Sequence, residues 1–258
     1  MRTTLSIAVA LALSLTGLHA DPVVYALPDG STYTADLDVK FTPKAFALFT
    51  VPGKSRQFWL HLVAKGGPRG LGLDVLRAEG DKHRSHHFDG VIGGAGPLVI
   101  DRSQLPGAGD PEPAGVAMGI TIALPILPPG EPHAAQTWQC NERIPVPPNK
   151  FVTVQEVEVV TKYTLKTINA DRLTASVTAV GSGKGPGGDC VNMDYAGDIA
   201  IERASGMPLS AKLEGHFAKS GVASALCRVT FTIALNGTRV VHGTGPAASL
   251  LGVNTQGD

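Results

Sequence analysis

Charge of one sign is not in excess in this sequence, which contains 22 Lys and Arg residues and 22 Asp and Glu residues among its 258 residues. Proteins that bind nucleic acid or an anionic membrane surface carry a concentrated basic patch, and the sequence has none. We therefore expect no nucleic-acid partner. Aromatic residues are also few, at 5% of the chain, whereas 31 Gly and 19 Pro residues predict many turns.

Catalytic and cofactor-binding motifs are missing as well. The sequence contains neither the GxSxG motif of a nucleophile elbow nor the HExxH motif of a zinc protease. The glycine-rich stretch 181–185 lacks the spacing of a phosphate-binding loop and has Gly185 where that loop needs a hydroxyl group. We expect no catalytic residue and no cofactor. An enzyme is disfavoured rather than excluded, because catalytic groups can converge from distant positions.

Long hydrophobic runs are absent beyond the first twenty residues. That segment has a single cation at Arg2, an apolar core from Leu5 to Leu18 and the small residue Ala20 at its end, which is typical of a secretory signal peptide over 1–20. No later stretch approaches the roughly 20 apolar residues of a transmembrane helix, and no Cys follows the expected cleavage point to accept a lipid. We expect a soluble, periplasmic or secreted chain with no integral membrane segment.

Cysteine is scarce, with only Cys140, Cys190 and Cys227 in the chain. No CxxC motif is present, so the spacing indicates neither a zinc site nor a redox site. An exported chain can keep a disulfide, and three cysteines predict one pair and one free thiol. Cys190 precedes one predicted strand and Cys227 begins another, which makes them the candidate disulfide. The alternative is three buried, inert thiols.

Alternation of polar and apolar residues is what the sequence has in abundance. Period-two runs indicate half-buried strands, and they occur at 32–40, 56–65, 71–75, 82–89, 116–124, 151–165, 172–180, 198–202, 209–217 and 227–235. We expect a single antiparallel β domain over 21–245. It has a first half at 21–124, a Pro-rich crossover at 125–150 and a β-meander at 151–236, and a flexible tail follows at 246–258.

The predicted strand at 151–165 changes parity along its length. Apolar residues fall at Val152 and Val154 and then at Val157 and Val159. A β-bulge near 155–156 explains the change, because a slip of one residue turns every side chain to the other face. Since bulges bend strands, the sequence predicts an all-β fold with a curved antiparallel sheet, either a half-open barrel or sandwich-like.

The densest polar cluster contains three histidines, His83, His86 and His87. On a helix they would share a face and could bind a metal. On the strand that the pattern predicts, His83 and His87 lie about 13 Å apart at roughly 3.3 Å per residue, too far to hold one ion. We therefore expect no metal site; a solvated polar strand is favoured over the rim of a ligand site. Trp59 and Trp138 could line a pocket, but core positions are favoured.

One resemblance rests on the Pro-rich approach to Trp138, on Tyr163-Thr-Leu-Lys, on the glycine-rich loop and on Gly197-Asp-Ile-Ala-Ile-Glu-Arg-Ala-Ser-Gly-Met-Pro-Leu. Over about Pro125 to Leu235, the chain resembles secreted bacterial β-rich proteins distantly similar to periplasmic lipoprotein and lipid carriers of the LolA and LppX type. The resemblance implies a curved sheet whose concave apolar face holds an acyl chain. It transfers no site residue, and this chain lacks the lipidated Cys of many such proteins.

The expected function follows from small aliphatic residues on the apolar faces of the predicted strands. Ala175, Ala179 and Ala211 leave room that larger side chains would fill, as in barrels that hold a ligand. We expect an exported protein that binds an apolar ligand, such as a lipid or the acyl chain of a lipoprotein. The alternative is a structural or interaction protein of the envelope that binds other envelope proteins and no small ligand.

Overall fold

A computed structural model describes most of the chain between Ser31 and His242 together with two earlier residues. The described residues are 23, 25, 31–44, 56–67, 70–79, 82–92, 98–100, 111–147, 154, 156–185, 188, 190–220, 228–238 and 241–242. The expected signal peptide at 1–20 and the expected tail at 246–258 lie outside them.

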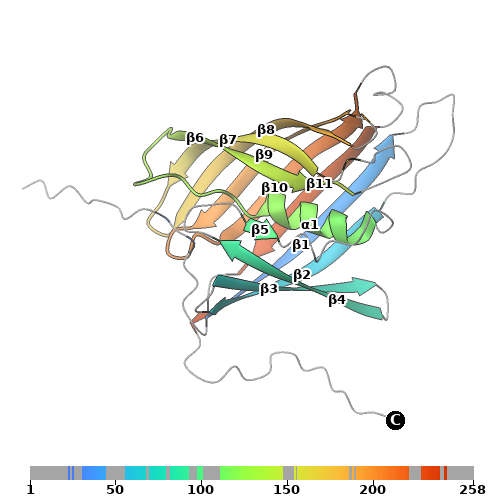
Figure 1. The fold of residues 1–258 in the computed structure, drawn as a ribbon. Coiled ribbons are helices and arrows are strands. Elements are labelled where there is room, and N and C mark those ends of the chain that lie inside the picture. The colour runs from blue at the N-terminus through green and yellow to red at the C-terminus, as the bar shows by residue number, and fades with distance from the viewer. Residues whose placement is uncertain are drawn as a thin grey trace, which may run out of the picture.

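One helix and twelve strands make up the described structure (Figure 1). In chain order they are β1 (Ser31–Lys44), β2 (Arg56–Gly67), β3 (Gly70–Glu79), β4 (Lys82–Ile92), β5 (Leu98–Ile100), α1 (Pro111–Ala123), β6 (Thr137–Pro145), β7 (Glu156–Ile168), β8 (Arg172–Lys184), β9 (Cys190–Glu202), β10 (Pro208–Lys219), β11 (Arg228–Gly237) and β12 (Val241–His242).

All strands belong to one antiparallel sheet. Its order is β5-β4-β3-β2-β1-β11-β10-β9-β8-β7-β6, and the short β12 also pairs with β1. The sheet is therefore two meanders, β1 to β5 and β6 to β11, which are joined where β1 pairs with β11 over ten residues from Ala35 to Lys44. The prediction of an all-β fold with a curved, open antiparallel sheet is confirmed.

Alternation along the strands gives the sheet one apolar face. In β8, for example, Leu173, Ala175, Val177 and Ala179 are buried, while the residues between them are more exposed. Successive side chains of a strand point to opposite faces, so these four share one face. The neighbouring strands repeat the pattern in register, which produces a continuous apolar surface on the inner side of the curve.

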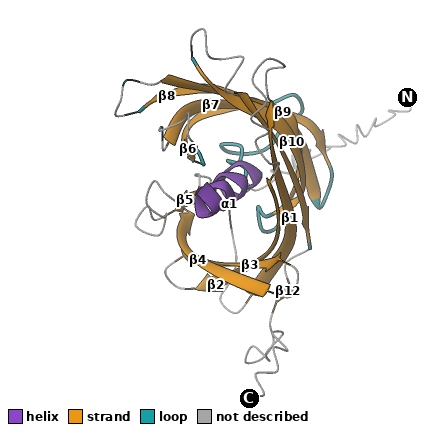
Figure 2. Cartoon of the chain, turned by 90° about the vertical axis from the view of Figure 1, so that its right-hand side faces the viewer, coloured by secondary structure: helices purple, strands orange, loops and turns teal. Residues whose placement is uncertain are grey.

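The inner side of the sheet holds α1. Figure 2 shows the strands curving around the helix, with β5 and β6 at the two ends of the curve. The sheet does not close, because β5 and β6 are its two edge strands. Helix α1 contacts both of these edges and also β1, β10 and β11 in the middle of the sheet. It thus occupies the place that a closed barrel would leave for its interior.

The prediction of a strand over 116–124 is wrong, because α1 covers this stretch. Every residue from Ala114 to Pro128 is buried. Because the stretch has no polar face, its sequence does not show the spacing of three to four residues that identifies an amphipathic helix. A helix that is apolar all round belongs in an interior. Prolines frame the helix: Pro111 and Pro113 stand in its first turn, where proline is tolerated, and Pro125 ends it.

The β-bulge expected at 155–156 falls at the boundary of the described residues. Strand β7 begins at Glu156 and pairs regularly with β6 from there, while Gln155 lies outside the described residues. The register shift in β7 lies instead between Leu165 and Thr167, where it pairs with β8. The β-bulge expected at 155–156 therefore stays a prediction.

Two loops expected from composition are strands. The Pro-rich crossover at 125–150 contains β6, and the glycine-rich stretch after Val180 continues β8 as far as Lys184. Gly181 is required there by close approach of the neighbouring strand, since a Cβ at this position would lie 2.1 Å from the carbonyl oxygen of Glu158. Within the described residues, no helix is long and apolar enough to cross a membrane.

Candidate functional site

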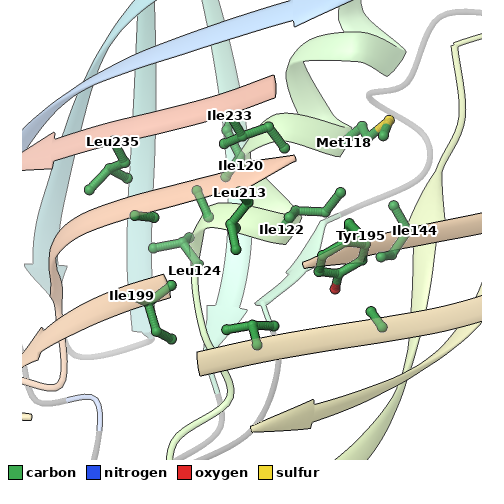
Figure 3. Packing of buried hydrophobic residues seen from close by; sticks show 14 of the residues in the cluster. Met118, Ile120, Ile122, Leu124, Ile144, Tyr195, Ile199, Leu213, Ile233 and Leu235 are labelled. Carbon is green, nitrogen blue, oxygen red and sulfur yellow. The ribbon is translucent and has the colours of Figure 1, made fainter. Parts of the chain in front are cut away.

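The interior of the curved sheet is the candidate site, and α1 fills it. Figure 3 shows Met118, Ile120 and Ile122 of α1 among inner-face residues of the sheet such as Leu213 and Ile233. All of these residues are 5% exposed or less. The site is therefore an apolar interior whose present occupant is a segment of the chain itself.

Close packing positions α1 on β1. A Cβ on Gly119 would lie 2.4 Å from Cγ2 of Val39, and a Cβ on Gly115, one turn earlier, would lie 3.1 Å from the ring of Phe41. Glycine at these two positions lets the helix axis approach the sheet more closely than any larger residue would allow. The contact is one of shape, with no polar group involved.

The described side chains of α1 form no hydrogen bond with the sheet. Thr121, the polar residue among the described side chains of the helix, donates to the carbonyl oxygen of Ala117 at 2.8 Å, within α1. The next part of the chain is held more firmly: Trp138 donates from Nε1 to the carbonyl oxygen of Ile126 at 2.9 Å, and its ring stacks on that of Tyr163 at 5.1 Å. The helix is thus anchored at its C-terminal end but only packed along its length.

A polar cluster interrupts the apolar inner face near the β6 edge. Glu142 of β6 is 5% exposed, and its Oε2 accepts a hydrogen bond from Thr161 of β7 at 3.0 Å. The hydroxyl of Tyr195, on β9, lies 3.0 Å from Oγ1 of Thr161 and 3.4 Å from Oε2 of Glu142. Sγ of Cys140 lies 3.9 Å from the other carboxyl oxygen, Oε1. We call these four residues the Glu142 cluster.

Burial sets the protonation of the cluster. It raises the pKa of Glu142 to about 7, although hydrogen bonds from Thr161, Tyr195 and Cys140 act in the opposite direction by favouring the carboxylate. Burial also raises the pKa of the Cys140 thiol to about 12, and the neighbouring carboxylate adds to this effect. The pKa of Tyr195 is raised well above its usual value by the same burial. The cluster therefore titrates through Glu142 alone near neutral pH.

A groove of about 510 Å³ lies on the opposite, outer face of the sheet. Lys166, Arg172, Lys212 and Asp198 are among its lining residues, and Lys166 lies at the register shift of β7 and pairs with Asp198 at 2.5 Å. The groove has the volume of a ligand pocket, but charged and hydroxyl side chains line it on a solvent-exposed surface. It does not suit an apolar chain.

The histidines proposed from the sequence lie on β4, as the strand prediction requires. His83 pairs with Ala78 of β3, and His86 and His87 pair with Val75 and Asp74. The side chains of β4 lie outside the described part of the structure. Among the side chains that are described, no three His, Cys, Asp or Glu residues are grouped to hold a metal ion.

The disulfide expected between Cys190 and Cys227 is not formed. Cys190 and Cys140 are free thiols, and Cys227 lies outside the described residues. Cys190 begins β9, whereas Arg228, next to Cys227 in the chain, begins β11, and β10 lies between these two strands.

The two tryptophans differ in burial. Trp138 is 7% exposed and belongs to the core, as expected, whereas Trp59 is 60% exposed on the outer face of β2. The Glu142 cluster was missed from the sequence because the stretch around β6 was taken for a crossover. Once β6 is recognised as a strand, Trp138, Cys140, Glu142 and Ile144 share one face of it. A glutamate among these otherwise apolar positions is the signal for a buried polar site.

No protein family model matches the chain, and no curated protein is similar to it in sequence. The resemblance to LolA- and LppX-type carriers stays a prediction.

Proposed function

We propose that this protein holds an apolar chain, such as the acyl chain of a lipid or lipoprotein, inside its curved sheet, in the place that α1 occupies. The inner face is apolar along the described side chains of both meanders, and the sheet stays open between its edge strands. An apolar chain entering between these edges gains the burial that α1 now supplies, about 0.8 kcal/mol for each methylene group removed from water.

The observation that carries the proposal is the way α1 is held. A buried polar group that loses its partner costs about 1–3 kcal/mol. The described side chains of α1 make no hydrogen bond to the sheet, and Thr121 keeps its own within the helix. An acyl chain can therefore replace the helix without leaving a hydrogen bond of these described side chains unmade. The hydrogen bond of Trp138 holds the segment after the helix in place, so that α1 can move away from the sheet about this point.

A disulfide that locks α1 to β1 tests the proposal. A Cβ on Gly119 lies 3.5 Å from Cβ of Val39, which is within the range of about 3.5–4.5 Å for disulfides. The double variant Val39→Cys and Gly119→Cys is made in a background with Cys140→Ala, Cys190→Ser and Cys227→Ser. Binding of a fluorescent long-chain alcohol is then measured in oxidised and reduced forms.

We expect the reduced double variant to bind the probe, the oxidised form to lose binding, and reductant to restore it. Each single cysteine variant serves as the matched control and binds equally in both states. Equal binding by the locked and unlocked forms, or no binding by the wild-type protein, contradicts the proposal. Native mass spectrometry of the protein as purified gives an independent check, because a bound lipid adds its own mass.

One observation favours the second candidate, an envelope protein that binds a protein partner. Trp59 is 60% exposed on the outer face of β2, flanked along the strand by the exposed Gln57 and His61. Exposed tryptophans are frequent anchors of protein interfaces. Under this candidate, Trp59→Ala abolishes retention of a specific envelope partner, whereas Gln57→Ala on the same face of β2 does not. Retention by both variants contradicts it.

A further inference from the structure

Glu142 is buried, and the described residues around it provide no cation. It lies on the inner face of β6, between Cys140 and Ile144, whereas Arg143 points to the outer face and pairs with Glu158 at 3.1 Å. No ion pair is formed by Glu142 among the described residues. A buried carboxyl group without a cation is costly, and an apolar residue of similar volume would be the cheaper choice for the core.

The hydrogen bonds within the cluster leave one carboxyl oxygen poorly satisfied. Oε2 of Glu142 takes the hydroxyl of Thr161, and the hydroxyl of Tyr195 lies closer to Thr161 than to the carboxyl group. Among the described residues, Oε1 has only the thiol of Cys140 at 3.9 Å, and that thiol also lies 3.7 Å from the carbonyl oxygen of Thr161. Thiols are weak donors, while a carboxylate has about four acceptor positions.

The position of the cluster relates it to the interior. Strand β6 is an edge of the sheet and contacts α1, and Figure 3 shows Ile144 and Tyr195 within the same group of residues as Met118 of the helix. A chain that takes the place of α1 would thus pass along the Glu142 cluster at the open side of the sheet. Among the described inner-face residues, Glu142 is the one buried carboxyl group, and the hydroxyls of Tyr33 and Tyr163 already form hydrogen bonds with the backbone.

We propose that the Glu142 cluster binds the polar end of the apolar ligand, and that this end carries an N–H or O–H donor, as in an amine or alcohol amphiphile. This inference rests on the proposed function, because it assigns the chemistry of the ligand for that same interior. A donor directed at Oε1 of Glu142 completes its hydrogen bonding. A carboxylate or phosphate end would meet Glu142 as a like charge and is rejected.

The test compares amphiphiles that share one chain and differ at the polar end. Hexadecylamine, hexadecanol and hexadecanoic acid each compete with a fluorescent probe for the purified protein at about pH 8, where Glu142 is ionised. We expect affinity to fall in the order amine, alcohol, acid. This ranking needs no variant, so it holds as a test even where a substitution disturbs folding.

Glu142→Gln separates a role in recognition from a role in packing. Gln keeps the shape of the side chain and loses its charge, so we expect the affinity for the amine to fall by about tenfold or more, and that for the acid to rise. The matched control is Glu158→Gln on the outer face of β7, which leaves all three affinities unchanged.

The outcomes distinguish this inference from the proposed function. Three equal affinities that Glu142→Gln does not change, or tightest binding of the acid, overturn the assignment to Glu142 and leave apolar binding intact. Failure of all three amphiphiles to bind overturns both.

Discussion

Thr161 donates a hydrogen bond of 3.0 Å to Oε2 of Glu142, and both residues are buried on the inner face of the sheet. This single strong donor does not offset the burial, so the pKa of Glu142 is raised to about 7. Cys140, Tyr163 and Tyr195 have raised pKa values as well and stay neutral below pH 8. Stability near neutral pH is therefore linked to this carboxyl group.

The first prediction is a loss of stability as pH rises from about 4.5 to about 7. The folded protein binds the proton of Glu142 more tightly than the unfolded chain, so its contribution is complete below the unfolded pKa and is lost through the folded pKa. The loss is about 3 kcal/mol, at about 1.4 kcal/mol for each pKa unit. Urea unfolding of the wild type and Glu142→Gln at a series of pH values measures it, since the variant removes this titration alone. A free-energy difference between the two that is constant with pH contradicts the prediction.

The second prediction is a slow thiol at Cys140. Because burial and Glu142 raise its pKa to about 12, the reactive thiolate at pH 8 is rarer than in a free cysteine by roughly three orders of magnitude. In a chain with Cys190→Ser and Cys227→Ser, alkylation of Cys140 by iodoacetamide is slower by a similar factor. Glu142→Gln removes the nearby negative charge and accelerates the reaction. Alkylation of Cys140 at the rate of a free thiol contradicts the pKa assignment.

Period-two alternation predicted the sheet well, because in most strands only one face is buried. The strand 172–180 is an example: the polar Thr174, Ser176 and Thr178 mark the outer face and leave the apolar set unambiguous. The same rule failed for 116–124, since α1 is buried on every side and neither set of alternating residues is polar. The prolines at the two ends of this stretch, which are typical of the first turn and of the end of a helix, were the signal that indicated α1.

The candidate site could be predicted only in part. The sequence predicted an apolar inner face, but it did not predict that α1 occupies the interior, because 111–123 was not recognised as a helix. The Glu142 cluster joins residues of β6, β7 and β9, and no local motif connects them, because Glu142 and Tyr195 lie 53 residues apart along the chain. The bulge expected at 155–156 stays a prediction, because Gln155 lies outside the described residues.

The third prediction concerns the contacts of Trp138 that anchor the C-terminal end of α1, which we call the clamp. Trp138 loses its hydrogen bond to the carbonyl oxygen of Ile126 and part of its stack on Tyr163 in the variant Trp138→Phe. An unpaired buried carbonyl and a smaller ring together cost about 2–4 kcal/mol. Trp59→Phe is the matched control, because Trp59 is 60% exposed, and it changes stability by about 0.5 kcal/mol or less. Equal effects of the two substitutions on the midpoint of chemical unfolding contradict a clamp.

The fourth prediction compares two glycines of α1. In a helix interior, Gly→Ala stabilises by about 1 kcal/mol when space allows. At Gly115 the new Cβ would lie 3.1 Å from a ring atom of Phe41, whereas at Gly119 it would lie 2.4 Å from Cγ2 of Val39. We expect Gly115→Ala to leave the free energy of unfolding nearly unchanged, and Gly119→Ala to lower it by about 1–3 kcal/mol through overpacking.

A double-mutant cycle ties the cost at Gly119 to its contact with β1. Val39→Ala removes the methyl group that a Cβ on Gly119 would meet. Each substitution alone lowers the free energy of unfolding, Gly119→Ala by overpacking and Val39→Ala by leaving a cavity. In the double variant the new Cβ occupies that cavity, so the double variant loses less stability than the two single variants together. The coupling energy is therefore favourable, at about 1 kcal/mol or more. Because the same contact holds α1 in the sheet, Gly119→Ala also weakens the competition of the helix with an apolar probe, and probe affinity rises. Additive effects of the two substitutions, with unchanged probe binding, would show that α1 is not seated on β1 through Gly119.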